Sequence, residues 1–182
     1  MERASAPWYV GRMQVVIRDE TPADLSAIHR LHASAFESDA EARLVDALRA
    51  SGALTLSLVA VVDGEVVGHI AFSPVVVESA IESWPGIGLG PMAVTAELRG
   101  RGIGGKLVEE GRRRLRADGH ALCVVLGHAD YYPRHGFVRA SLHGIRWEKP
   151  VPDEVFFVQE LVPGGLVGVT GTVRYRPEFD AV

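Results

Sequence analysis

The segment that most constrains the fold is "AVTAELRGRGIGGKLVEEGRRRL", residues 93–115, in which four glycines fall within six positions directly before a helical pattern. The run that leads into it, "LGPMAV", is typical of a short strand, and residues 103–116 place apolar side chains at helical spacing. Beyond the Asp118-Gly119 turn, "ALCVVLG" is a continuous apolar run typical of a strand that is buried on both faces. A strand, a helix and a strand in this order predict a parallel βαβ unit with a right-handed crossover.

The rest of the chain predicts further helices before this segment and strands on both sides of it. Thr21 followed by Pro22 indicates a helix start, and Ser38 with Glu41 three residues later predicts a capping box for a second helix. Other expected features are a strand at 13–19, a helix end at Gly52, a hairpin turn at Asp63-Gly64, an interruption at "SWPGIG", and strands within "FVRASLHGIRWEKPVPDEVFFVQEL" and "GTVRYRP". The expected class is therefore mixed α/β (α+β).

Length and composition agree with one globular domain without metals or disulfides. The 182 residues are 47% hydrophobic, and we expect a single domain at 13–182 that follows a loose extension at 1–12. The net charge of −4 and the pI near 6.0 argue against a nucleic-acid partner. No apolar run resembles a signal peptide or a membrane span, so we expect a cytoplasmic protein with no membrane partner. Cys123 is the only cysteine, and its apolar neighbours predict a buried, inert thiol.

The glycine loop suits a phosphate, because glycines let an anion approach the free N–H groups at a helix N-terminus. Two nucleotide-binding patterns overlap on it, and both fit poorly. Gly100, Gly102 and Gly105 match the dinucleotide pattern G-x-G-x-x-G, but the first carboxylate after the next strand is Asp130, too far along to hold a ribose. The pattern of nucleotide hydrolases fails at Leu107, which cannot ligate magnesium as Ser or Thr would.

A third pattern, [RQ]-x-x-G-x-[GA], is met by Arg99, Gly102 and Gly104, and with it the chain resembles the GNAT superfamily of N-acetyltransferases. The segment "HADYYPRHGF" is similar to that family's Tyr-x-x-x-Gly-Phe, with Tyr132 and Gly136 in the matching places. Details such as "GHIAFSPV", "GLGPMAV" and "YYPRHGF" are most similar to its YhbS-like bacterial branch. The resemblance is strongest over 86–137.

This resemblance implies a mostly antiparallel central sheet, flanked by helices, whose fourth and fifth strands splay apart. It also implies acetyl-CoA as cosubstrate, with its pyrophosphate on the backbone N–H groups of residues 101–105 and its pantetheine arm added like a strand at the end of the fourth strand. The implied cofactor-binding residues are Met92, Ala93, Val94, Arg99, Gly100, Arg101, Gly102, Ile103, Gly104 and Gly105.

The resemblance further implies that an amine attacks the thioester directly. Tyr132 would then be the acid that protonates the departing thiolate. Many members of the family carry a glutamate on the fourth strand as base, whereas "GIGLGPMAV" has no ionisable side chain. The base is left open among Glu41, His69, Glu78, Asp130 and water, and His69 could instead be a satisfied strand histidine.

Several alternatives remain at this stage. A catalytically degenerate module that binds or senses acyl-CoA would also carry the glycine loop. His128, Asp130 and His135 stand close in sequence but form a weak metal pattern, so no metal is expected. His29 and His32 share a helix face that we expect at a solvated edge. The acceptor is unidentified, and a homodimer is possible.

Overall fold

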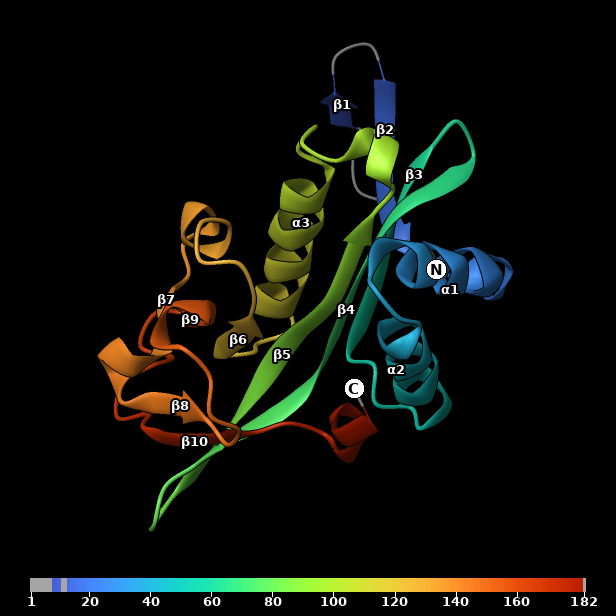
Figure 1. Cartoon of the computed structure of the whole chain (residues 1–182). Coiled ribbons are helices and arrows are strands. Elements are labelled where there is room, and N and C mark those ends of the chain that lie inside the picture. The colour runs from blue at the N-terminus through green and yellow to red at the C-terminus, as the bar shows by residue number, and fades with distance from the viewer. Residues whose placement is uncertain (1–7, 11–12, 182) are drawn as a thin grey trace. The chain divides into compact units, whose positions relative to one another are not determined.

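The computed structural model describes residues 8–10 and 13–181 (Figure 1). The helices are α1 (Leu25–Ala35), α2 (Ala40–Ala50) and α3 (Ile103–Ala117). The strands are β1 (Trp8–Val10), β2 (Met13–Asp19), β3 (Leu56–Val62), β4 (Glu65–Glu78), β5 (Ser83–Val94), β6 (Leu122–Leu126), β7 (Val138–Arg139), β8 (Ile145–Trp147), β9 (Phe156–Glu160) and β10 (Gly171–Arg174). The 3-10 helices are η1 (Pro22–Asp24), η2 (Ala96–Leu98), η3 (Tyr132–His135), η4 (Ala140–His143), η5 (Asp153–Val155) and η6 (Pro177–Ala181).

These elements form two compact units. The first holds the described residues up to Phe72, residues 91–111 and those from Glu178 onward, and the second holds residues 73–90 and 112–177. Strands β4 and β5 and helix α3 each belong partly to both units. Within the described residues no helix is long and apolar enough to cross a membrane. The expected extension at 1–12 lies mostly outside the described residues, and its described part is β1, which pairs with β2.

The sheet of the first unit is an antiparallel meander of β1, β2, β3 and the first half of β4. The expected strand at 13–19 is confirmed as β2. Asp63 and Gly64 adopt left-handed φ angles of 50° and 87° and join β3 to β4, as the hairpin prediction requires.

Helices cover both faces of this meander. One apolar cluster joins α1 and α2 to β3 and β4; it consists of Ile28, Val45, Val59 and Ala71. On the other face, a Cβ added to Gly68 would lie 3.1 Å from Leu107 of α3. Gly68 and Ala71 are three residues apart on β4, and successive strand residues point to opposite faces of the sheet. Helices α1 and α2 therefore cover the face of Ala71, and α3 covers the face of Gly68.

The start of α2 differs from the sequence prediction, whereas its end agrees. The capping box of Ser38 with Glu41 is wrong: the helix begins at Ala40 with Asp39 as N-cap. The Ser38 hydroxyl instead accepts a hydrogen bond from the Ala40 N–H at 3.2 Å, a local turn that delays the helix by one residue. At the other end, Gly52 takes a φ of 69° and stops the helix as predicted.

The second unit contains the predicted parallel pair. Residues Ile87–Leu89 of β5 pair in parallel with Cys123–Val125 of β6, which α3 connects, so the βαβ prediction is confirmed. Strand β5 continues to Val94, beyond the residues that pair with β6. Antiparallel pairings join β6 to β9, β9 to β7 and β10 to β4, while β8 and β10 pair in parallel.

The expected interruption at "SWPGIG" is wrong, because β5 runs through it from Ser83. The glycines there make room for neighbouring side chains. A Cβ on Gly86 would lie 2.5 Å from Leu122, and one on Gly88 would lie 2.7 Å from Tyr175. These glycines therefore serve packing within the strand.

Candidate active site

The glycine loop connects the end of β5 to α3 and has the backbone that an anion site needs. Gly100 and Gly102 adopt φ angles of 74° and 83°, which other residues rarely take, and a Cβ at either would meet nothing within 4 Å. Conformation, not space, thus requires glycine here. The Lys106 N–H bonds to the Gly102 carbonyl at 3.1 Å, so the N–H groups of residues 103–105 precede the first bonds of the helix ladder. These donors lie at the positive end of the α3 dipole.

Arg99 ties this loop to two neighbouring segments. Its Nε donates to the Val94 carbonyl at 3.1 Å, and its Nη2 donates to the Ala35 carbonyl at 3.3 Å. The guanidinium therefore joins the end of β5, the loop and the end of α1. Arg101 is exposed and makes no such contact among the described residues.

Tyr132 lies in η3 of the second unit, within an aromatic cluster. The ring is 7% exposed and packs on Tyr131, Phe137 and Phe157 with centroid distances of 5.1, 5.6 and 6.2 Å. A Cβ on Gly127 would collide with it. Burial, with Tyr131 adding to it, raises the pKa of Tyr132 above its usual 10.0. The phenol is therefore fully protonated at neutral pH.

The turn after Tyr132 depends on the Tyr-x-x-x-Gly-Phe spacing. Gly136 ends η3 with a φ of 83°, and the preceding carbonyl of His135 accepts hydrogen bonds from Arg112 at 2.7 Å and Gln159 at 3.0 Å. A Cβ on Gly136 would lie 2.7 Å from the Gln159 Nε2. Backbone conformation thus requires glycine here, and a larger residue would also displace the Gln159 amide.

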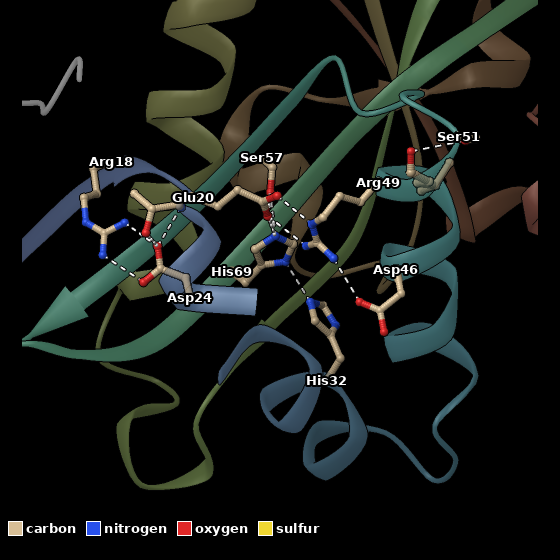
Figure 2. Close-up of polar contacts among 11 residues, drawn as sticks. Arg18, Glu20, Asp24, His32, Asp46, Arg49, Ser51, Ser57 and His69 are labelled. Atoms are coloured by element: carbon tan, nitrogen blue, oxygen red, sulfur yellow. Dashed lines mark hydrogen bonds and ion pairs between the residues drawn. The ribbon is translucent and has the colours of Figure 1, made fainter. Parts of the chain in front are cut away.

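A network of polar side chains between the sheet and the helices α1 and α2 was not expected from the sequence (Figure 2). Its centre is the Glu20 carboxylate, which accepts two hydrogen bonds from Arg49 at 2.7 and 2.9 Å and one from the Ser57 hydroxyl at 2.5 Å. The two charged side chains are only 16% and 19% exposed. Burial by itself would raise the pKa of Glu20, but the hydrogen bonds from Arg49, His69 and Ser57 hold it far below its usual 4.5.

Two buried histidines extend this network. Ser57 Oγ lies 2.8 Å from His69 Nε2, and His69 Nδ1 lies 2.8 Å from His32 Nε2. Both histidines have no exposed surface, so the expected solvated edge is wrong for His32. Burial, followed by the charges of His69, Arg49 and His29, lowers the pKa of His32 from 6.5 to about 3. Burial also lowers the pKa of His69, although Glu20 opposes it.

The four side chains considered as the base lie in different environments. His69 lies inside the network. Glu41 lies in the first turn of α2, and its Oε2 is buried with no hydrogen-bond partner among the described residues. Glu78 is half exposed and pairs with Arg174 at 3.3 Å, and Asp130 is exposed.

The structure also places the residues considered as metal ligands and the single cysteine of the sequence. The described residues contain no group of three or more His, Cys, Asp or Glu side chains that could hold a metal, and His128 and Asp130 are exposed. Cys123 is fully buried, and burial raises its pKa to about 12. The predicted burial of the thiol is therefore confirmed, and its raised pKa disfavours the reactive thiolate.

The fold agrees with comparisons to known proteins. The model of the acetyltransferase (GNAT) domain matches residues 16–140, well over half of the chain. The chain belongs to the GNAT superfamily, and it is an N-acetyltransferase. The mixed fold with its mostly antiparallel sheet is that of the superfamily.

Two relatives from Escherichia coli K12 are similar over most of the sequence. The uncharacterized N-acetyltransferase YhbS is 43% identical over 167 residues, which cover 91% of this chain and 99% of YhbS. The uncharacterized N-acetyltransferase YjhQ is 39% identical over 135 residues, which cover 72% and 75% of the two chains. The expected similarity to the YhbS-like branch is therefore confirmed.

Two solved structures share the fold. The crystal structure of E. coli YhbS in complex with CoA superposes with a TM-score of 0.87 at 42% identity, covering 92% of this chain and 93% of YhbS. A GNAT-family acetyltransferase from Brucella melitensis in complex with acetyl-CoA gives a TM-score of 0.73 at 39% identity, covering 91% and 98%.

Proposed function

We propose that the protein transfers the acetyl group of acetyl-CoA to an amine, which attacks the thioester directly. The observation that carries this proposal is the glycine loop, where two left-handed glycines precede the free N–H groups of α3. The CoA and acetyl-CoA complexes of the two solved relatives support the same ligand.

The pyrophosphate of acetyl-CoA would lie on the backbone N–H groups of residues 101–105. A helix N-terminus attracts an anion through its dipole and through donors that have no partner within the helix. The two hydrogen bonds of Arg99 to backbone carbonyls support a role in shaping the loop. Arg101, which is exposed, would add positive charge.

The pantetheine arm would pair with the backbone of Met92, Ala93 and Val94 at the end of β5. These residues follow the stretch of β5 that pairs with β6, which ends at Leu89. An added strand uses main-chain hydrogen bonds and asks little of side chains. Ala93, which is 5% exposed, therefore remains free to serve the core.

Tyr132 would protonate the departing thiolate. Its buried phenol holds its proton at neutral pH and can donate it as negative charge develops on sulfur. The attacking amine must also be neutral. An alkyl ammonium with a pKa of about 10.4 pays roughly 4 to 5 kcal/mol for deprotonation at pH 7, so a base is needed as well.

The first experiment is calorimetric titration of acetyl-CoA, with NAD and ATP as controls, on wild type and Gly102→Asp. Aspartate would strain the left-handed backbone and place a negative charge against the pyrophosphate, so we expect affinity to fall at least about 100-fold.

The matched control is Gly119→Asp. Gly119 is exposed, has a φ of 84° and has no neighbour within 4 Å of a Cβ, so it carries the same strain outside the loop. Equal loss in both variants, or no acetyl-CoA binding by wild type, would contradict the assignment of the loop. Binding without release of free CoA across a panel of amines would point to an acyl-CoA sensor.

The acceptor is constrained only by charge. The net charge of −4 favours a cationic amine, because opposite charge raises the rate of encounter. A homodimer stays a prediction, which light scattering at several concentrations would test.

A further inference from the structure

The directions of the hydrogen bonds in the network follow from one fixed charge. Glu20 is a carboxylate at all ordinary pH values, so it can only accept, and the Ser57 hydroxyl donates to it. The Ser57 oxygen is then left to accept from His69 Nε2–H.

The same reasoning fixes the second histidine. His69 is neutral and carries its proton on Nε2, so its Nδ1 is a lone pair that must accept from His32 Nε2–H at 2.8 Å. A neutral His32 with its proton on Nε2 has a bare lone pair on Nδ1. That atom is buried and has no hydrogen-bond partner among the described residues.

The chain of hydrogen bonds therefore ends at His32 Nδ1, an acceptor that receives no hydrogen bond from the described residues. Every proton in it points toward Glu20, and the open end is a buried nitrogen base. A buried polar atom without a partner is costly, and such atoms in folded proteins call for an explanation.

The helix that carries His32 ends beside the proposed acetyl-CoA loop. His32 is in the last turn of α1, three residues before Ala35, whose carbonyl accepts from Arg99 at 3.3 Å. The next residue, Phe36, stacks on His32 at a centroid distance of 6.0 Å and is itself 36% exposed. Phe36 therefore lies between the buried His32 ring and solvent, on the side from which an amine would approach.

Given the acetyl transfer proposed above, on which this inference rests, we propose that His32 is the base of the reaction and that His69, Ser57 and Glu20 position it and receive its charge. As the free amine attacks the thioester carbon, its nitrogen becomes cationic and much more acidic. Its N–H bond then breaks as His32 Nδ1–H forms, and the Nε2 proton of His32 passes to His69 Nδ1.

The positive charge then resides on His69, whose Nε2 is 3.6 Å from Glu20 Oε2. His29 and Arg49 are the other basic groups that act on His32, and Glu20 already neutralises Arg49. The proton returns through His32 to solvent after the amide has formed, while the thiolate takes its proton from Tyr132.

The variant that tests the base is His32→Gln. The glutamine amide can keep a donor toward His69 but offers no base in place of Nδ1. We expect kcat with acetyl-CoA and the best amine of a primary-amine panel to fall at least 100-fold, with calorimetric acetyl-CoA affinity within two-fold of wild type. The matched control is His29→Asn, one turn earlier on α1 with a half-exposed ring, which should stay within two-fold in both.

The pH profile shows which form of the amine reacts. The pKa of His32 lies far below that of an ammonium ion, so free amine should react in both proteins, and log kcat/KM should rise by about one per pH unit from pH 6 to 9. The His32→Gln profile should lie at least 100-fold below that of wild type throughout this range. A folded His32→Gln whose profile coincides with that of wild type would overturn the proposal.

A second measurement does not depend on the variant folding. Long-range ¹⁵N–¹H spectra of wild type labelled on histidine should show both buried rings with protons on Nε2 and bare Nδ1 atoms from pH 8 to 5. Ser57→Ala should disturb the His69 tautomer and lower kcat about tenfold. An Nδ1–H tautomer of His32 would overturn the proposal.

The two proposals fail in different ways. Absence of acetyl-CoA binding, or of CoA release with every amine, would count against the proposed function. The histidine tautomers would then test the proton path from His32 to His69 by themselves. Normal binding and turnover that survive His32→Gln unchanged would reject only the role of His32 as the base.

Discussion

The glycine loop at residues 99–105 and the network around Glu20 belong to the same unit but are distributed very differently along the chain. The loop is one continuous stretch whose glycines are required by their own backbone angles. The network joins residues from α1, α2, β3 and β4, and His32 and His69 are 37 residues apart. A requirement on local conformation is visible in residue spacing, whereas a requirement on partners depends on where the fold places them.

Lowering the pH should reduce the stability contributed by the network around Glu20 more than any of the substitutions below. The buried histidines have folded pKa values below 6.5, so the unfolded chain binds more protons below that pH. Their contribution is fully present above pH 6.5 and is lost as pH falls toward the folded values. We expect His32 to lower the free energy of unfolding by about 1.4 kcal/mol per pH unit between pH 6.5 and 4.5, and His69 to add a loss in the same direction, measured by urea unfolding.

Glu20 acts in the same direction at lower pH. Its folded pKa lies below the usual 4.5, so its contribution is present above pH 4.5 and is lost in stronger acid. His32→Gln removes one titrating group and should have the shallower slope between pH 6.5 and 4.5. Identical slopes in the two proteins would mean that His32 does not titrate as a buried neutral group.

Breaking the central ion pair should give the next largest effect. Glu20→Gln leaves the mostly buried Arg49 without its counter-charge, and we expect a loss of about 3 kcal/mol in the free energy of unfolding at pH 7. The comparison variant is Arg174→Gln, which breaks the pairs of an exposed arginine with Glu78 and Glu148 and should cost much less, because solvent screens exposed charges. Equal losses in urea unfolding would show that burial does not distinguish the two pairs.

Tyr132→Phe tests a catalytic residue that the sequence predicted. We expect kcat to fall roughly 100-fold, equal to about 2.7 kcal/mol in the activation barrier, while acetyl-CoA affinity stays within two-fold. Stability should change little, because the ring still packs on Phe137 and Phe157. An unchanged kcat would assign Tyr132 to packing alone.

Most elements of the fold could be predicted, because their signals are local. The βαβ unit, the Asp63-Gly64 turn and the stop at Gly52 follow from periodicity and backbone conformation. The errors have a common cause. The glycines of "SWPGIG" were interpreted as breaks, although Gly86 and Gly88 make room for Leu122 and Tyr175, which come from distant segments.

The candidate site likewise contains some residues that the sequence could predict and others that it could not. Gly100, Gly102 and Tyr132 stand in patterns with fixed spacing, so the sequence could nominate them. Nothing in the sequence signals that His32 is buried, since the same helical spacing would suit a solvated face. Its partner His69 was considered as a base, but Ser57 and Glu20 carry no pattern that links them to it.

The sequence by itself determined the class of fold, the loop that can hold a phosphate and the tyrosine of the second motif, because each depends on residues that are close along the chain. Only the tertiary structure decided which buried groups face one another. The proton positions in the network follow from the Glu20 charge, and that charge acts on His69 and His32 only after β3, β4 and the two helices have packed together.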